Sequence, residues 1–140
     1  MVEEIIKQEM QRAKLVEYNA STDNHAKETV LVTELRYEDL HYKPFTLKLE
    51  RHKKDYSIKI QLPYSYKTRM LLPFYTSSLN QVRKDWKISK TPKIKHYIIR
   101  NITPMETKNI LKAHQKGLKK IRSLKNRFDH TFIKHNHFLN

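Results

Sequence analysis

Residues 45–62 read FTLKLERHKKDYSIKIQL, and apolar side chains occupy every second position on both sides of a short polar run. A period of two predicts two antiparallel strands joined as a hairpin, with one face of the pair buried. Pro63 follows the second run, and we expect that strand to end there because proline cannot donate to a strand ladder. The turn of the hairpin is basic, since it consists of Arg51-His52-Lys53-Lys54.

The chain before the hairpin predicts a helix, a loop and a strand. Apolar residues recur every three or four positions from Val2 to Glu17, as is typical of an amphipathic helix. Asn19–Lys27 is polar and predicts a loop, whereas the β-branched run within Glu28–Tyr37 predicts a strand. The side chains that we expect the helix to bury are Val2, Ile5, Ile6, Met10, Ala13 and Val16.

The chain after the hairpin gives weaker signals. Residues 64–75 fit neither period clearly, and we expect Pro73 to interrupt any element there. The elements that we expect next are a short helix over Thr76–Lys87 with Ser77 or Ser78 as its N-cap, a basic connector over Ile88–Lys95 and a fourth strand over Lys95–Ile102.

Thr103-Pro104-Met105-Glu106 has the residues of a helix N-terminus. Thr103 can cap the helix, proline is favoured at the first helical position, and Glu106 can complete a capping box. Gly117 lies inside the pattern that follows, where it costs about 1 kcal/mol relative to alanine and permits a bend. The apolar stripe of this helix consists of Ile110, Leu111, His114, Leu118, Ile121, Leu124 and Phe128. The opposite side carries Lys108, Lys112, Lys116, Lys119, Lys120, Arg122 and Arg127.

These elements predict an α+β protein: a single antiparallel sheet of three to four strands, with the N-terminal helix and the long basic C-terminal helix packed on one face. The length of 140 residues suits one domain. Within residues 1–140 we distinguish an acidic helix–strand segment over 1–42, a basic sheet and helix core over 43–128, and a His-rich tail over 129–140 that we expect to be flexible.

The positive charge is concentrated after Tyr42. Residues 1–42 contain 5 Lys/Arg and 9 Asp/Glu, residues 43–140 contain 24 Lys/Arg and 5 Asp/Glu, and the net charge is +15. Because like charges repel and destabilise a compact state, such an excess indicates a polyanionic partner. For a protein inside the cell that partner is usually nucleic acid.

Several classes of protein and compartment do not fit the sequence. The chain contains no cysteine, which excludes disulfides and a thiolate zinc site. It begins Met1-Val2-Glu3-Glu4, and this acidic start does not suit a signal peptide. Its longest apolar runs are far shorter than the roughly 20 residues that span a bilayer. We therefore expect a cytoplasmic, non-secreted protein without a cofactor or a membrane partner.

Three basic segments are candidates for contacting DNA or RNA: the last helix, the hairpin turn and the connector. Lysines three and four residues apart share a face of a helix, from which they can follow phosphates or enter a groove. Lys48 and Lys59, on the outward face of the hairpin, are expected to extend this charge across the sheet. The residues that we expect to contact nucleic acid are Lys108, Lys112, Lys116, Lys119, Lys120, Arg122, Arg127, Arg51, Lys53, Lys54, Lys90, Lys93 and Lys95.

Aromatic side chains lie among basic ones in residues 64–86. Such aromatics can stack on unpaired bases, although their apolar neighbours favour packing in the core. The aromatic residues are Tyr64, Tyr66, Phe74, Tyr75 and Trp86, and the basic residues between them include Lys67, Arg69, Arg83 and Lys84.

Features that would support metal binding or catalysis are sparse. Gly117 is the one glycine, so the sequence has no glycine-rich phosphate loop, and the carboxylates after Tyr42 lack motif spacing. His130, His135 and His137 with Asp129 form a cluster near the C-terminus, which we interpret as a polar tail because metal ligands have to converge. A metal-independent ribonuclease stays open as an alternative, with His52, Tyr56, Lys59, His96 and Arg100 as its residues.

The leading hypothesis is a non-catalytic nucleic-acid-binding accessory protein of a phage or mobile element, which contacts phosphates through its basic helix and hairpin. A second hypothesis is a phage-type inhibitor or adaptor that docks on a nucleic-acid enzyme such as an RNA-guided nuclease. The third is a small ribonuclease toxin.

Overall fold

The computed structural model describes the backbone of residues 2–18, 29–37, 45–64 and 69–139, and the side chains of residues 2–13, 31–37, 45–64 and 69–124. The predicted loop over Asn19–Lys27 lies outside these residues. The elements in chain order are α1 (Val2–Met10), β1 (Lys14–Tyr18), β2 (Thr29–Arg36), β3 (Thr46–His52), β4 (Tyr56–Pro63), α2 (Leu72–Val82), β5 (Lys87–Lys90), β6 (Ile94–Ile102) and α3 (Pro104–Leu139).

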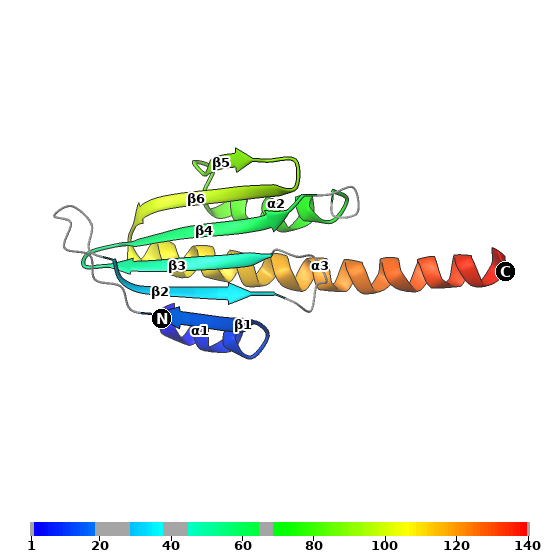
Figure 1. Ribbon diagram of the computed structural model, residues 1–140, viewed down its shortest axis with the longest axis horizontal. Helices are drawn as coiled ribbons and strands as arrows, with labels where there is room; N and C mark the ends of the chain where they lie inside the picture. Colours follow the sequence, from blue (N-terminus) through cyan, green and yellow to red (C-terminus); the bar gives the residue numbers. More distant parts are fainter. Residues whose placement is uncertain (1, 19–28, 38–44, 65–68, 140) are drawn as a thin grey trace.

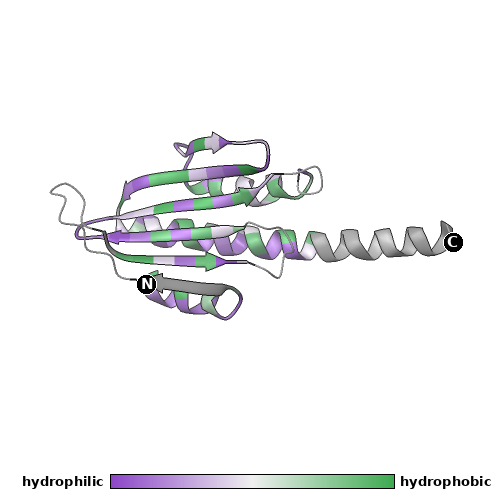
Figure 2. Ribbon diagram, viewed as in Figure 1, coloured by the Kyte–Doolittle hydropathy of each residue, from purple (hydrophilic) through white to green (hydrophobic). Residues whose placement is uncertain are grey.

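The strands form one antiparallel sheet in the order β1-β2-β3-β4-β6-β5. The predicted hairpin is confirmed as β3 and β4, with Leu47 opposite Ile60 and Leu49 opposite Ile58. Figure 2 shows the expected alternation of hydrophobic and hydrophilic residues along these strands. The predicted strands over Glu28–Tyr37 and Lys95–Ile102 are confirmed as β2 and β6.

All three helices cover the same face of the sheet (Figure 1). α3 lies behind the middle strands, α1 along the β1 and β2 side, and α2 along the β6 side, so the order across the helix layer is α1, α3, α2. The predicted α+β class is therefore confirmed, including the N-terminal and C-terminal helices. The sheet has six strands rather than three or four.

The predicted N-terminal helix is too long. It ends at Met10, and Lys14–Tyr18 forms β1 instead, where Leu15 pairs with Leu35 of β2. Val16 and Tyr18 favour a strand, and pairing along β2 satisfies the backbone of this segment. The apolar spacing in Leu15-Val16 fits both periods, so the sequence pattern alone did not separate helix from strand.

The second helix also differs from the prediction. Pro73 lies in the first turn of α2 rather than interrupting it, because an N–H group in the first turn has no partner within the helix. The helix begins at Leu72, so the predicted caps Ser77 and Ser78 lie inside it. Leu71 is the N-cap residue and provides no side-chain hydrogen bond.

The predicted basic connector contains a short strand. β5 pairs with β6 at the edge of the sheet, with Ile88 opposite Tyr97 and Ser89 opposite His96. Its four residues are exposed, and its lysines suit an edge position because charged side chains discourage pairing with another chain. A four-residue strand with this composition is hard to recognise from hydrophobic periodicity.

The predicted start of the last helix is confirmed. Thr103 Oγ1 accepts a hydrogen bond from the Glu106 backbone N–H at 3.2 Å, and a Glu106 carboxylate oxygen accepts from the Thr103 N–H at 3.4 Å. The helix that follows contains 36 residues and extends past the sheet in Figure 1. Residues 129–139, which the sequence suggested as a separate tail, belong to this helix.

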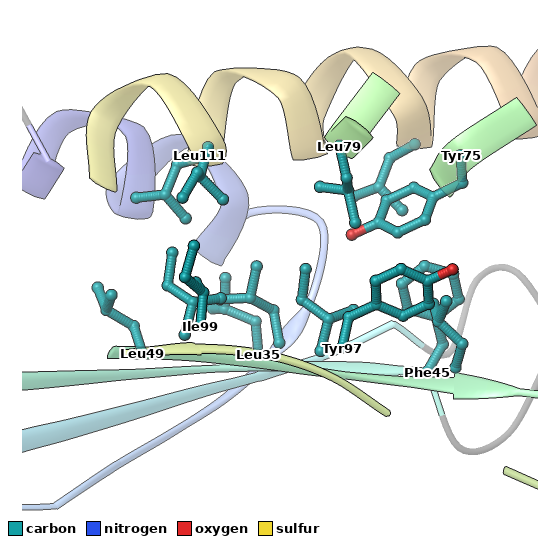
Figure 3. Packing of buried hydrophobic residues seen from close by; sticks show 14 of the residues in the cluster. Leu35, Phe45, Leu49, Tyr75, Leu79, Tyr97, Ile99 and Leu111 are labelled. Carbon is teal, nitrogen blue, oxygen red and sulfur yellow. The ribbon is translucent and has the colours of Figure 1, made fainter. Parts of the chain in front are cut away.

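The core lies between the sheet and the helix layer. Figure 3 shows Leu79, Tyr75 and Leu111 of the helices facing aliphatic and aromatic side chains that rise from the sheet. Gly117 of α3 lies so close to α2 that a Cβ atom there would stand 2.8 Å from Tyr75 Cδ1 and 3.2 Å from the Tyr75 carbonyl oxygen. The glycine therefore allows close approach of the two helices.

A chain of hydrogen bonds crosses this core and connects all three helices with the end of β2. Its members are Tyr75, His114, Tyr37 and Glu9, which we call the buried relay, and none exposes more than 1% of its surface. The Tyr75 hydroxyl lies 2.5 Å from His114 Nδ1, and the Tyr37 hydroxyl lies 2.8 Å from His114 Nε2 and 2.7 Å from Glu9 Oε2. The other Glu9 oxygen accepts from Gln115 Nε2 at 3.2 Å.

The direction of the relay follows from its chemistry. Burial, with a smaller contribution from the charge of Arg122, lowers the pKa of His114 to about 3, so the ring is neutral at neutral pH. The single hydroxyl proton of Tyr37 is donated to Glu9, so the Tyr37 oxygen accepts from His114 Nε2–H. Nδ1 is then the acceptor for Tyr75 O–H. Burial first, and the Glu9 charge second, raise the pKa of both tyrosines, which keeps the hydroxyl protons in place.

We expect Tyr37→Phe to destabilise the protein more than Tyr75→Phe. The first change leaves a Glu9 oxygen without its donor and His114 Nε2–H without its acceptor, whereas the second unpairs only His114 Nδ1. At roughly 1–3 kcal/mol for each unpaired buried group, the expected losses are about 2–6 and about 1–3 kcal/mol. Urea unfolding of both variants measures them, and a larger loss for Tyr75→Phe would contradict the assigned direction.

The stability should also depend on pH through His114. Its pKa is about 3 in the folded protein and near 6.5 when unfolded, so between these values the unfolded chain binds the extra proton. Stability present above about pH 6.5 is therefore lost as the pH falls toward 3, by roughly 2 kcal/mol at pH 5. Urea unfolding at pH 7 and pH 5 tests this, with His114→Gln as the variant that should lose the dependence.

Candidate nucleic-acid interface

The outer side of α3 carries a row of lysines. Its inner side buries the predicted apolar stripe from Ile110 to Ile121 against the core, and the residues a half-turn away therefore point outward. Lys108 is half-buried and the other members of the row are exposed. We use the term lysine row for Lys108, Lys112, Lys116, Lys119 and Lys120.

The row is a regularly spaced set of charges. Lysines four residues apart on a helix are separated by about 6 Å along its axis, and the distance from Lys108 to Lys120 is about 18 Å. Glu106 is the one acidic residue between Pro104 and Leu124. Within the described part of the chain, the lysines of the row form no ion pair.

Three acidic residues of the basic part, Glu50, Asp85 and Glu106, form ion pairs with cations outside the lysine row. Arg83, at the end of α2, forms ion pairs with both Glu106 and Asp85. Its hydrogen bond lowers the pKa of the exposed Asp85 carboxyl to about 2. Glu50, on β3, lies 3.6 Å from Lys48 Nζ. These three carboxylates therefore form their ion pairs with cations that do not belong to the lysine row.

Arg122 differs from the lysines although the sequence groups it with them. It is half-buried, and its guanidinium lies 5.7 Å from the centre of the Tyr37 ring, beside the buried relay. The Arg122 side chain thus lies at the edge of the core, where its methylene groups can pack against apolar surface. Arg127 lies on α3 beyond the residues whose side chains are described.

The hairpin turn lies at the start of α3. Together with Pro104 it surrounds a hollow of about 360 Å³ that is open to solvent. His52 also lines this hollow, and its Nε2 lies 3.1 Å from the Ser57 hydroxyl oxygen. The basic residues of the turn that the sequence predicted as contacts are Arg51, Lys53 and Lys54, and all three are exposed.

The other predicted basic segment lies at the far end of the sheet, where β5 turns into β6 (Figure 1). Lys90 Nζ lies 4.1 Å from the centre of the Tyr64 ring, and Arg69 lies 5.9 Å from it. Hydrogen bonds from Lys90 and Arg69 lower the pKa of the Tyr64 hydroxyl. Lys93 and Lys95 follow in the turn and in β6, and Lys95 Nζ lies 5.2 Å from the Tyr97 ring centre.

The three predicted patches are therefore separate. The hairpin turn and the β5–β6 turn lie at opposite ends of the sheet, and the lysine row lies on the helix layer between them (Figure 1). Lys48 and Lys59 are opposite one another in the hairpin and face away from the helices, since their neighbours Leu47, Leu49 and Ile60 face the core. They therefore carry positive charge on the outer face of the sheet, away from the lysine row on the helix layer.

The residues considered for a ribonuclease do not converge. Tyr56 packs against the core face of the sheet, whereas Lys59 and His96 lie on the outer face. His52 contacts Ser57 and His96 contacts Gln61, and these two β4 residues are about 13 Å apart along the strand. A general acid and a general base both have to lie within about 3 Å of the reacting atoms. This spacing does not favour an acid–base pair.

Metal sites and membrane spans find no support in the described residues. No group of three His, Asp or Glu side chains among them is placed to hold a metal ion. The predicted polar cluster of Asp129, His130, His135 and His137 lies outside the described side chains. No helix in the described ranges has the length and apolarity needed to cross a bilayer.

The aromatic residues divide between the core and the surface. Tyr75 and Trp86 are buried, as their apolar neighbours suggested, and Trp86 packs edge-on against Tyr97. Phe74 is 42% exposed, and Lys120 Nζ lies 5.6 Å from its ring centre. Local spacing gave no sign of which of the adjacent Phe74 and Tyr75 would be buried. Tyr66 and Lys67 lie outside the described residues.

Comparison of the chain with models of protein families, with curated proteins and with solved structures yields no match. The case for an interface therefore depends on the geometry and charge of the lysine row.

Proposed function

We propose that this protein is a non-catalytic accessory protein that binds nucleic acid, and that the lysine row of α3 is its main contact surface. The observation that carries the proposal is the set of outward lysines without acidic partners in the described part of the chain. Regularly spaced positive charges are neutralised best by a ligand that carries regularly repeated negative charge, as the phosphates of DNA and RNA do.

An ordinary solvated helix face is the competing explanation of this row. Solvated faces usually alternate acidic and basic residues, which form pairs along the helix. In this row the lysine ammonium groups repel one another, and the net charge of +15 destabilises the folded protein further. A bound polyanion relieves this repulsion and releases its own counterions, so binding is strongly favoured at low salt.

The arrangement favours recognition of the nucleic-acid backbone. Lysine ammonium groups contact phosphates as point charges and carry little sequence information. The hairpin turn and the β5–β6 turn, one at each end of the sheet, offer further cations to a ligand longer than the row. We therefore expect a modest preference among sequences and a steep dependence on salt.

The triple variant Lys112→Gln, Lys116→Gln, Lys119→Gln should weaken binding and flatten its salt dependence. Each lost phosphate contact lowers the slope of log K against log salt by about 0.7–0.9, so the slope should fall by about 2–3. Fluorescence anisotropy with labelled DNA and RNA, single-stranded and duplex, over a salt series measures this slope.

The matched control is Lys59→Gln, Lys84→Gln, Lys87→Gln, which removes the same charge from exposed positions away from the row. Equal slopes for the two triple variants would mean that net charge alone attracts the ligand, and the row would lose its assigned role. No binding of any nucleic acid by the unaltered protein would overturn the proposal and favour the alternative of an adaptor that docks on a protein.

A further inference from the structure

We infer that Phe74 forms a base-stacking site beside the lysine row, and that the ligand of this surface is single-stranded nucleic acid. This inference rests on the proposed function and specifies its ligand. The juxtaposition that carries it is an exposed aromatic ring on α2 directly against the last lysine of the row on α3.

The packing of α2 on α3 puts the ring in this position. Gly117 lets Tyr75 approach α3 closely, and the Tyr75 hydroxyl is fixed by His114. Residues adjacent in a helix point about 100° apart, so a buried Tyr75 directs Phe74 out of the core. Lys120 lies about one turn beyond Gly117 on α3, and its ammonium nitrogen is 5.6 Å from the centre of the Phe74 ring, farther than Lys90 from Tyr64.

Phe74 is exposed although other large side chains of α2 are buried in the core. Phe74 as a residue is 42% exposed, whereas Tyr75 and Leu79 of the same helix are completely buried. Met70, just before α2, is 68% exposed and adds apolar surface at this end of the helix. An aromatic face with a cation beside it suits a nucleobase, which stacks on the ring while its phosphate meets the lysine.

The geometry selects unpaired bases. In a duplex each base is stacked between its neighbours, so its face is not available to a side chain on the protein surface. A single strand can place its phosphates along the row and turn a base onto Phe74. Tyr64 is less suited to this role because Lys90 lies only 4.1 Å from its ring centre.

The test compares a labelled single-stranded oligonucleotide with an abasic strand that has the same number of phosphates. Stacking of one base is worth roughly tenfold in affinity, so the unaltered protein should bind the base-bearing strand about tenfold more tightly. Phe74→Leu keeps an apolar side chain of similar size but removes the aromatic face, and should abolish this difference. Phe74→Tyr should retain it.

Val82→Ala is the matched control, because Val82 is a 40% exposed apolar residue on the same helix without an aromatic face. It should leave the tenfold difference unchanged. Circular dichroism confirms that each variant is folded.

Equal affinity of the unaltered protein for the two strands would overturn the stacking site, and with a steep salt slope the proposed function would still stand. A difference that persists in Phe74→Leu would also overturn it, since the bases would then contact another surface. If neither strand binds at any salt concentration, the proposed function fails as well, and Phe74 would be assigned to a protein contact.

Discussion

The hydrogen bonds around His114 determine how the helix layer is assembled on the sheet. One imidazole ring contacts Tyr75 of α2 on one side and Tyr37, at the end of β2, on the other, and Tyr37 continues to Glu9 of α1. Because these polar groups are buried, each of them needs its partner, so the arrangement tolerates little sliding or rotation of any helix. α1 has only nine residues and would be marginal alone, so Glu9 helps to hold it in place.

The relay has a direct effect on the surface. With His114 pointing into the core, the rotation of α3 about its axis is fixed, and the lysines on the other side have to face solvent. The same contact fixes Tyr75, and with it the side of α2 that faces outward. The same rotation of α3 about its axis therefore buries His114 and exposes the lysines. Arg122 lies at the boundary, against the Tyr37 ring.

The sequence predicts local features of this fold well and long-range ones poorly. The alternation in residues 45–62 and the capping box at Thr103 are strong signals because each depends on neighbouring residues only. Glu9 is not among the side chains that the sequence predicted to be buried, yet it is buried because Tyr37 and Gln115 satisfy its oxygens. These partners are 28 and 106 residues away, and no local period reveals them. For the interface, lysine spacing predicted the row, but the separation of the row from Lys48 and Lys59 follows only from the topology.

The four-residue spacing of the row also determines how the line of lysines is inclined to the axis of α3. Four residues exceed one helical turn, so each successive lysine is displaced by about 40° around the axis, and the line through Lys108, Lys112, Lys116 and Lys120 is inclined by about 26° to α3. It begins on the side of α3 where Gln115 meets Gln8 of α1 and ends where Lys120 meets Phe74 of α2. A strand that follows this line would cross the helix layer diagonally, from the α1 side to the α2 side. The sense of that diagonal is a property of right-handed helices, so a strand bound along the row as we propose would follow a handed path.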